Sequence, residues 1–106
     1  MKKIYVAGSF KDLDTSRQAA REIEKLGFHV LISAPGDPKG IDGCFERIEM
    51  ADAIYVSNPR GETGKSVSLD LGFAIARGKS IFAMKPITDP PISHHTKVIA
   101  ELKELT

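Results

Sequence analysis

The sequence has 106 residues, 42% hydrophobic and 27% charged, which is typical of one globular domain over 1–106 and excludes a disordered or membrane-spanning chain. The formal net charge of +1 argues against a broad basic surface for a nucleic-acid polymer, so any anion site must be local. Because Cys44 is the single cysteine, no intrachain disulfide is possible, and we expect a cytoplasmic protein without membrane contact. A domain this small is close to the lower limit of comfortable stability, which makes a homodimer a reasonable expectation.

Short apolar runs rich in β-branched or aromatic residues alternate with segments of helical period. The expected strands are Lys3–Ala7, Phe28–Ile32, Ala53–Ser57 and Ser80–Met84. The expected helices are Thr15–Leu26, about Gly43–Met50, about Ser66–Arg77 and Thr96–Leu105. Asp14, Thr15 or Ser16 is available to cap the first helix, and Gly27 is expected to end it.

The alternation of strands and helices defines the expected fold class. Strands that are apolar along their whole length are typical of a parallel sheet covered on both faces. We therefore expect an α/β three-layer sandwich of the Rossmann or flavodoxin-like type, with four parallel strands, or five, in the order 2-1-3-4. Two breaker-rich stretches, Ser33–Asp42 and Pro86–Ser93, are predicted to be loops.

Two strand-to-helix loops are candidates for a binding site. In such sheets, ligands bind beyond the carboxyl ends of the strands, where the strand order reverses. Glycines in these loops let backbone amides approach an anion at the start of a helix. The residues expected to form the site are Gly8, Ser9, Phe10, Lys11, Gly61, Gly64, Lys65 and Ser66.

The segment GETGKS is similar to part of a phosphate-binding P-loop, but the full motif is absent. It requires a glycine five residues before Gly64, where Pro59 stands, and Asp52 is no adequate partner for Mg²⁺. Adjacent histidines, His94 and His95, point in different directions on a helix and do not make a two-ligand metal site. We expect neither a metal nor an organic cofactor.

Asp70 lies four residues beyond Ser66, in a segment of apolar neighbours. One interpretation is a first-turn acid that the helix dipole stabilises. The other is a nucleophile or electrostatic stabiliser that faces the pocket. The residues alone leave both open.

Three segments, IYVAGSF, MADAIYVSNPRG and GETGKSVSLDLGFAIARGKSIF, cover much of the chain. They resemble the nucleoside 2-deoxyribosyltransferase family, which includes small N-glycosidases of nucleoside monophosphates. The third segment is the most specific, with a glycine-rich loop, then an acid, then glycine and an alanine-rich helix that ends at Gly-Lys. The resemblance implies a nucleoside or nucleotide as ligand and a homodimer whose sites a neighbouring subunit completes.

The resemblance also implies roles for individual residues. Asp70 stands where the family has a glutamate that attacks the anomeric carbon of the sugar, and it is one methylene shorter. Tyr5 would orient this carboxylate, Gly8 and Ser9 would approach the sugar or its 5′-phosphate, Phe10 would border the base, and Lys11 would lie near phosphate. Each of the three side chains also has a structural alternative. Tyr5 could fill the core, Phe10 could form a hydrophobic staple at the start of the helix, and Lys11 could be solvated.

A further acid of the family, expected to protonate the leaving base, is replaced here by Cys44. Asp42 or Glu46 is available from the same loop–helix junction, and their spacing does not decide between them. Cys44 itself has no companion histidine or cysteine and is expected to be inert. Arg60 is a loop charge, either solvated or in contact with phosphate.

The leading hypothesis is cleavage or transfer of the N-glycosidic bond of a nucleoside or nucleoside 5′-monophosphate, with Asp70 as nucleophile. Ser9, Lys11, Lys65 and Ser66 would surround one pocket mouth and favour a phosphate. The alternative is a nucleotide-binding module of the same fold without catalysis. A flavodoxin-like scaffold for a phosphorylated cofactor ranks last, because the loop after the third strand lacks aromatic planes to flank a flavin.

Overall fold

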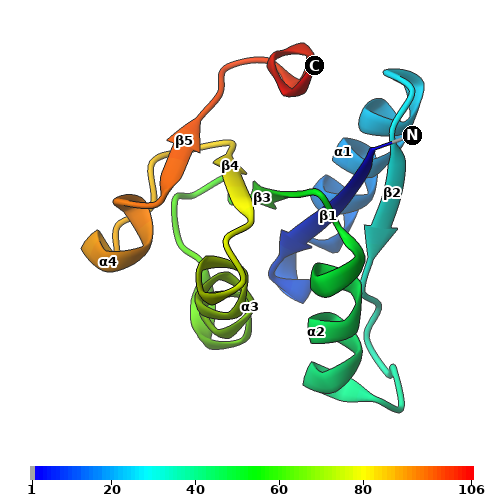
Figure 1. Ribbon diagram of the computed structural model, residues 1–106, viewed down its shortest axis with the longest axis vertical. Coiled ribbons are helices and arrows are strands. Elements are labelled where there is room, and N and C mark those ends of the chain that lie inside the picture. Colours follow the sequence, from blue (N-terminus) through cyan, green and yellow to red (C-terminus); the bar gives the residue numbers. More distant parts are fainter. Residues whose placement is uncertain (1) are drawn as a thin grey trace.

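The computed structural model describes residues 2–106, whose strands form one five-stranded, all-parallel sheet in the order β2-β1-β3-β4-β5 (Figure 1). The strands are β1 (Lys3–Gly8), β2 (His29–Ile32), β3 (Ala53–Ser57), β4 (Ser80–Ala83) and β5 (Thr96–Val98). The helices are α1 (Leu13–Lys25), α2 (Gly40–Met50), α3 (Gly64–Ala76) and the short α4 (Pro90–Ser93), with 3-10 turns η1 (Phe10–Asp12) and η2 (Leu102–Leu105). The predicted three-layer α/β sandwich and the order of its first four strands are confirmed.

Each face of the sheet has its own apolar core. On one face α2 and α3 lie side by side, and Ile48 and Leu71 from them pack with Ile54 of β3. On the other face α1 packs with η2, and Ile23 contacts the cluster around Ile4. Because β1 and β3 are buried on both faces, their apolar runs are continuous rather than alternating.

The predicted C-terminal helix over Thr96–Leu105 is wrong. Thr96–Val98 instead extends the sheet as β5, pairing Thr96 with Ile81 and Val98 with Ala83, and only η2 is helical. The apolar spacing was misleading because Ile99 and Leu105 are buried on the α1 face while Val98 is 45% exposed. Two β-branched residues, Thr96 and Val98, fit a short edge strand better than a helix.

Several predicted boundaries shift. The helix α2 begins at Gly40 and α3 at Gly64, each earlier than predicted, and Pro86–Ser93 contains α4, which the Asp89 side chain caps. None of the predicted caps opens α1; η1 precedes it, and Ser9 caps η1 by accepting from the amide of Lys11 at 3.2 Å. Gly27 follows α1 with a φ of 101°, as expected for a glycine that ends a helix.

The register of the sheet positions the site. Gly8, the last residue of β1, is paired with Ser57, the last residue of β3, so the loops after both strands start at one edge. The chain runs outward from β1 to β2 on one side and from β3 to β4 on the other, which makes β1–β3 the point where strand order reverses. No helix in the described part of the chain is long and apolar enough to span a membrane.

Candidate active site

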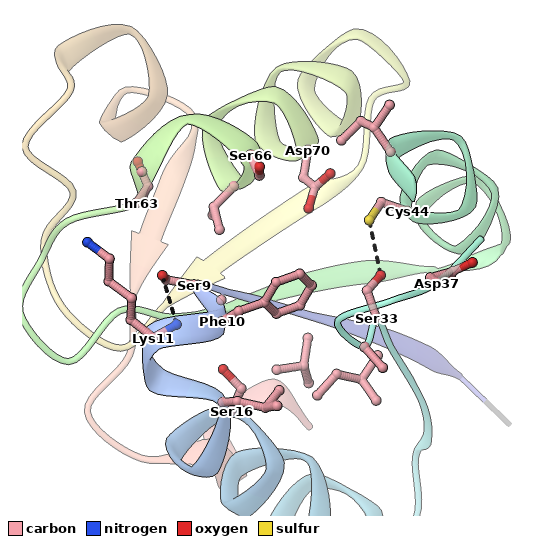
Figure 2. Close-up of a pocket in the computed structure, with 18 of the residues that line it drawn as sticks. Ser9, Phe10, Lys11, Ser16, Ser33, Asp37, Cys44, Thr63, Ser66 and Asp70 are labelled. Atoms are coloured by element: carbon pink, nitrogen blue, oxygen red, sulfur yellow. Dashed lines mark hydrogen bonds between the residues drawn. The ribbon is translucent and has the colours of Figure 1, made fainter. Parts of the chain in front are cut away.

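A pocket of about 580 Å³ opens at the carboxyl ends of β1 and β2 and beside the start of α3 (Figure 2). Most of the residues predicted for the site line it: Tyr5, Gly8, Ser9, Phe10, Lys11, Gly64, Lys65, Ser66 and Asp70. Gly61 lies outside the pocket, in a turn where its amide donates to the carbonyl of Asn58 at 2.9 Å. Its φ of 81° and the nearby carbonyl of Pro86, 3.2 Å from the position of a Cβ, explain why glycine stands there.

A third wall of the pocket was not predicted. The loop after β2 and the start of α2 contribute Ser33, Asp37 and Cys44 to the lining. Because β2 lies next to β1, its carboxyl end opens at the same edge of the sheet. Two signals could have assigned this loop to the site: the strand order, and the family resemblance, which places an acid of the site at the position of Cys44.

Asp70 is deeply buried at the inner end of the pocket. It is the seventh residue of α3, in the second turn, so the interpretation as a first-turn acid at the helix start is wrong. The residue is 4% exposed, and its Oδ1 atom finds no hydrogen-bond partner among residues 2–106. Oδ2 accepts from the Tyr5 hydroxyl at 3.5 Å, which is at the long limit for a hydrogen bond.

The environment of Asp70 changes its acidity. Burial raises the pKa of this carboxyl to about 6, although the hydrogen bond from the Tyr5 hydroxyl lowers it in part. The group is therefore mostly ionised at neutral pH but titrates far above an exposed aspartate. Burial, and next the charge of Asp70, raises the pKa of Tyr5 above its usual range, so the phenol stays protonated and remains a donor.

Polar side chains from the unpredicted wall connect to Tyr5. The Tyr5 and Ser33 hydroxyls are 2.8 Å apart, and the Cys44 thiol is 3.1 Å from the Ser33 oxygen. Arg47 donates from Nη1 to Ser33 at 3.1 Å and from Nη2 to Asp37 at 2.6 Å. The hydrogen bond from Arg47 is the main cause of the lowered pKa of Asp37.

The outer end of the pocket gathers groups that suit an anion. Ser9 and Lys11 follow β1, while Lys65 and Ser66 occupy the first turn of α3, where helix amides are free to bind a negative charge. Gly8 lets this loop pack closely, because a Cβ there would lie 2.3 Å from Ser16 Oγ. Figure 2 shows the Lys11 side chain extending past Ser9 on the side of Thr63.

Other candidate residues lie elsewhere. Arg60 makes a bidentate pair with Asp12, both contacts at 2.8 Å. Neither Asp42 nor Glu46 lines the pocket, and Glu46 pairs with Lys39 on the surface at 2.9 Å. In the described part of the chain, no three His, Cys, Asp or Glu side chains gather in an arrangement that would hold a metal ion.

Comparisons with known proteins support the fold. No family model matches the sequence, and no curated protein does either. A conserved protein from Enterococcus faecalis V583 superposes with a TM-score of 0.70 at 19% identity, covering 99% of this chain and 94% of that chain. The Clostridium botulinum CMP N-glycosidase BcmB gives 0.67 at 14% identity, covering 98% of this chain and 94% of that chain.

A third similar structure is a 2-deoxyribosyltransferase from Bacillus psychrosaccharolyticus, with a TM-score of 0.67 at 18% identity, covering 97% of this chain and 89% of that chain. At these identities the similarity defines the class of fold, a doubly wound, flavodoxin-like α/β sandwich. The second and third of these structures are named as enzymes that act on nucleosides or nucleotides.

Proposed function

We propose that this protein cleaves or transfers the N-glycosidic bond of a nucleoside or nucleoside 5′-monophosphate, with Asp70 as the nucleophile. The observation that carries the proposal is the buried Asp70 carboxylate, which lines the pocket and whose Oδ1 accepts no hydrogen bond within residues 2–106. Burying a carboxylate oxygen without a partner is costly, so its retention points to a ligand. The fold shared with an N-glycosidase and a deoxyribosyltransferase adds support.

The geometry suggests a sequence of bond changes. Oδ1 attacks the anomeric carbon while Tyr5 holds Oδ2, and the bond from that carbon to the base breaks with its electrons leaving on the base. Negative charge on Asp70 stabilises the positive charge that develops on the sugar ring. Water then hydrolyses the glycosyl ester, or a second base displaces it. Tyr5 donates equally to the carboxylate and to the ester carbonyl.

A 5′-phosphate matches the outer end of the pocket. Two ammonium groups, those of Lys11 and Lys65, and two hydroxyls, those of Ser9 and Ser66, line the region where α3 begins. A neutral nucleoside needs no such concentration of donors. The exposed ring of Phe10 lies at the same pocket and offers a flat apolar surface to the base.

The leaving base needs a proton, and the carboxylates of the pocket do not supply it well. Asp37 lines the pocket, but its pKa is lowered by the hydrogen bond from Arg47. Asp42 and Glu46 lie outside the pocket. We therefore propose that the proton comes from water or from a second copy of the chain.

A homodimer through α2 and α3 would bring such a second copy near. The outer side of α3 exposes 59% of Leu69, and Phe73 stacks on Phe45 of α2 with ring centroids 4.5 Å apart. An exposed apolar helix side next to a site is typical of a protein interface. Sedimentation velocity of wild type and of Leu69→Glu tests the proposal, since the charge should produce monomers; an unchanged sedimentation coefficient contradicts it.

Release of free base from a panel of nucleosides and nucleoside 5′-monophosphates tests the activity. Asp70→Asn should reduce the rate by about a thousandfold or more, because the amide cannot act as the nucleophile. Asp42→Asn, outside the pocket, is the matched control and should retain activity. Full activity of Asp70→Asn would rule out this mechanism.

The alternative is a nucleotide-binding module that does not catalyse. The observation that favours it is the depth of Asp70, whose short side chain is held 3.5 Å from Tyr5 and 4% exposed. Calorimetry with nucleoside monophosphates separates the two functions. Tight binding without base release, even after Asp70→Glu restores the longer side chain, would favour the module.

A further inference from the structure

We propose that Ser33 and Arg47 are positioning residues that fix the direction of the Tyr5 hydroxyl, so that Tyr5 holds Oδ2 of Asp70 and leaves Oδ1 to the substrate. The inference rests on the proposed function for its consequence in catalysis. Its physical content, a directed chain of hydrogen bonds that ends on Asp70, can be measured independently of any reaction.

The direction of the chain follows from counting hydrogens. An ionised Asp70 only accepts, so Tyr5 must use its single hydrogen on Oδ2. The Tyr5 oxygen, 2.8 Å from Ser33, must then accept the Ser33 hydrogen. The Ser33 oxygen accepts from Arg47, which can only donate.

Cys44 completes the assignment. With its own hydrogen committed to Tyr5, Ser33 has one lone pair left, and the Cys44 thiol at 3.1 Å donates to it. A thiol that donates to Ser33 is compatible with the direction of the chain towards Asp70.

Arg47 anchors the outer end of the chain. Its second nitrogen is held by Asp37 at 2.6 Å, so the guanidinium spans a carboxylate and the Ser33 hydroxyl. A cationic donor strengthens the bonds further along such a chain, because each polarised hydroxyl becomes a better donor to the next acceptor. Ser33 and Arg47 therefore act on Asp70 through Tyr5, without touching the carboxylate.

Several ionisable groups share the pocket with Asp70 and must be kept constant in a test. They are Tyr5 on β1, Lys11 in the following loop, Asp37 before α2, Cys44 on α2 and Lys65 on α3. Removing the Ser33 hydroxyl changes none of these charges, whereas removing Arg47 also takes away the ion-pair partner of Asp37. Ser33→Ala is for this reason the primary variant.

The experiment is a double-mutant cycle read by NMR. The side-chain carboxyl carbon of Asp70 is titrated in wild type, Ser33→Ala, Tyr5→Phe and the double variant. Ser33→Ala should raise the pKa of Asp70 by about half a unit or more, because Tyr5 becomes a weaker donor. In the Tyr5→Phe background the same change should have no effect, because the connection is already broken.

Matched controls address folding and charge. Ser57→Ala removes another buried serine hydroxyl, outside the pocket, and should leave the Asp70 titration unchanged. Arg47→Met should shift the titration as Ser33→Ala does, and Arg77→Met, which breaks the exposed pair between Arg77 and Glu49, should not. Ser33→Thr keeps a hydroxyl and should restore the wild-type titration.

Kinetics provide a second reading. In Ser33→Ala, kcat for base release should fall several-fold while KM changes by less than about twofold, as expected for a group that orients the nucleophile. An Asp70 pKa that does not move in Ser33→Ala, or that moves equally with Tyr5 absent, overturns the inference. A wild type that releases no base refutes the proposed function instead, while the NMR cycle still decides whether the chain exists.

Discussion

Asp70→Asn is expected to stabilise the folded protein at neutral pH and to lose that advantage in acid. The carboxyl is 4% exposed, and its pKa is raised by burial from 3.8 to about 6. At about 1.4 kcal/mol for each unit, this difference corresponds to about 3 kcal/mol of unfavourable free energy for the ionised form in the fold. The asparagine side chain has a similar shape and carries no charge to bury.

The sign follows from where protons bind. The folded state holds the Asp70 proton more tightly than the unfolded chain. The protonated group therefore makes its full favourable contribution to the free energy of unfolding below about pH 3.8. It is lost as pH rises through about 6, where the folded protein must ionise a buried group. The free energy of unfolding of Asp70→Asn, minus that of wild type, should therefore grow by about 3 kcal/mol between acid and pH 8.

Urea denaturation of both proteins between about pH 4 and pH 8 measures this difference. Subtracting the two curves at each pH removes the titration of all other groups. Asp37→Asn is a control of opposite sign, because the hydrogen bond from Arg47 lowers the pKa of Asp37. Loss of this carboxylate should destabilise the folded protein at neutral pH and have a smaller effect in acid. A difference for Asp70→Asn that stays flat with pH, or a wild type that is the more stable at pH 8, would refute the reasoning.

Three further changes have defined outcomes. Gly8→Ala should lower the free energy of unfolding in urea by about 1–3 kcal/mol, because its Cβ would lie 2.3 Å from Ser16 Oγ, and Ser16→Ala should restore part of the loss. Leu71→Ala, at a fully buried position, should cost about 2–5 kcal/mol by the same assay; a cost below 1 kcal/mol would mean that the site collapses around the smaller side chain. Lys11→Ala should weaken calorimetric binding of a nucleoside monophosphate by about tenfold, while Arg60→Ala, whose guanidinium already pairs with Asp12, should change it little; equal effects would contradict the assignment.

Two of the four strands that the sequence predicted, β1 and β3, are buried on both faces, whereas β2 and β4 are only partly buried. Both strands are central in the sheet, so Ile4–Ala7 and Ala53–Val56 are continuous apolar runs, and each run is visible in the sequence without knowledge of its neighbours. Thr96–Val98 has no such signal. It has three residues, one of them a lysine, and it is a strand because β4 offers it a free edge.

The site was predictable to the extent that topology fixes it. Gly8 and the start of α3 come together because parallel strands end at one edge, and this needs only the strand order. Ser33 and Arg47 were missed because their relation to Tyr5 crosses from β2 and α2 to β1, with no local pattern to mark it. Gly61 was assigned to the site because it lies in a glycine-rich loop. In the structure its positive φ allows the turn in which its amide donates to the carbonyl of Asn58.

The position of Asp70 in its helix distinguishes a structural role from a functional one. An acid in the first turn would be stabilised by free amides, and an acid in an ion pair would have its pKa lowered, as Asp37 does. Asp70 has neither form of stabilisation: its pKa is raised, and Tyr5 alone among the described residues donates to it. A typical domain has a free energy of unfolding of about 5–15 kcal/mol. A cost of about 3 kcal/mol for ionising Asp70 in the folded state is large for a residue with no function. In the proposed function, a ligand that approaches Oδ1 gives the buried charge its partner, and this links the carboxylate to the pocket.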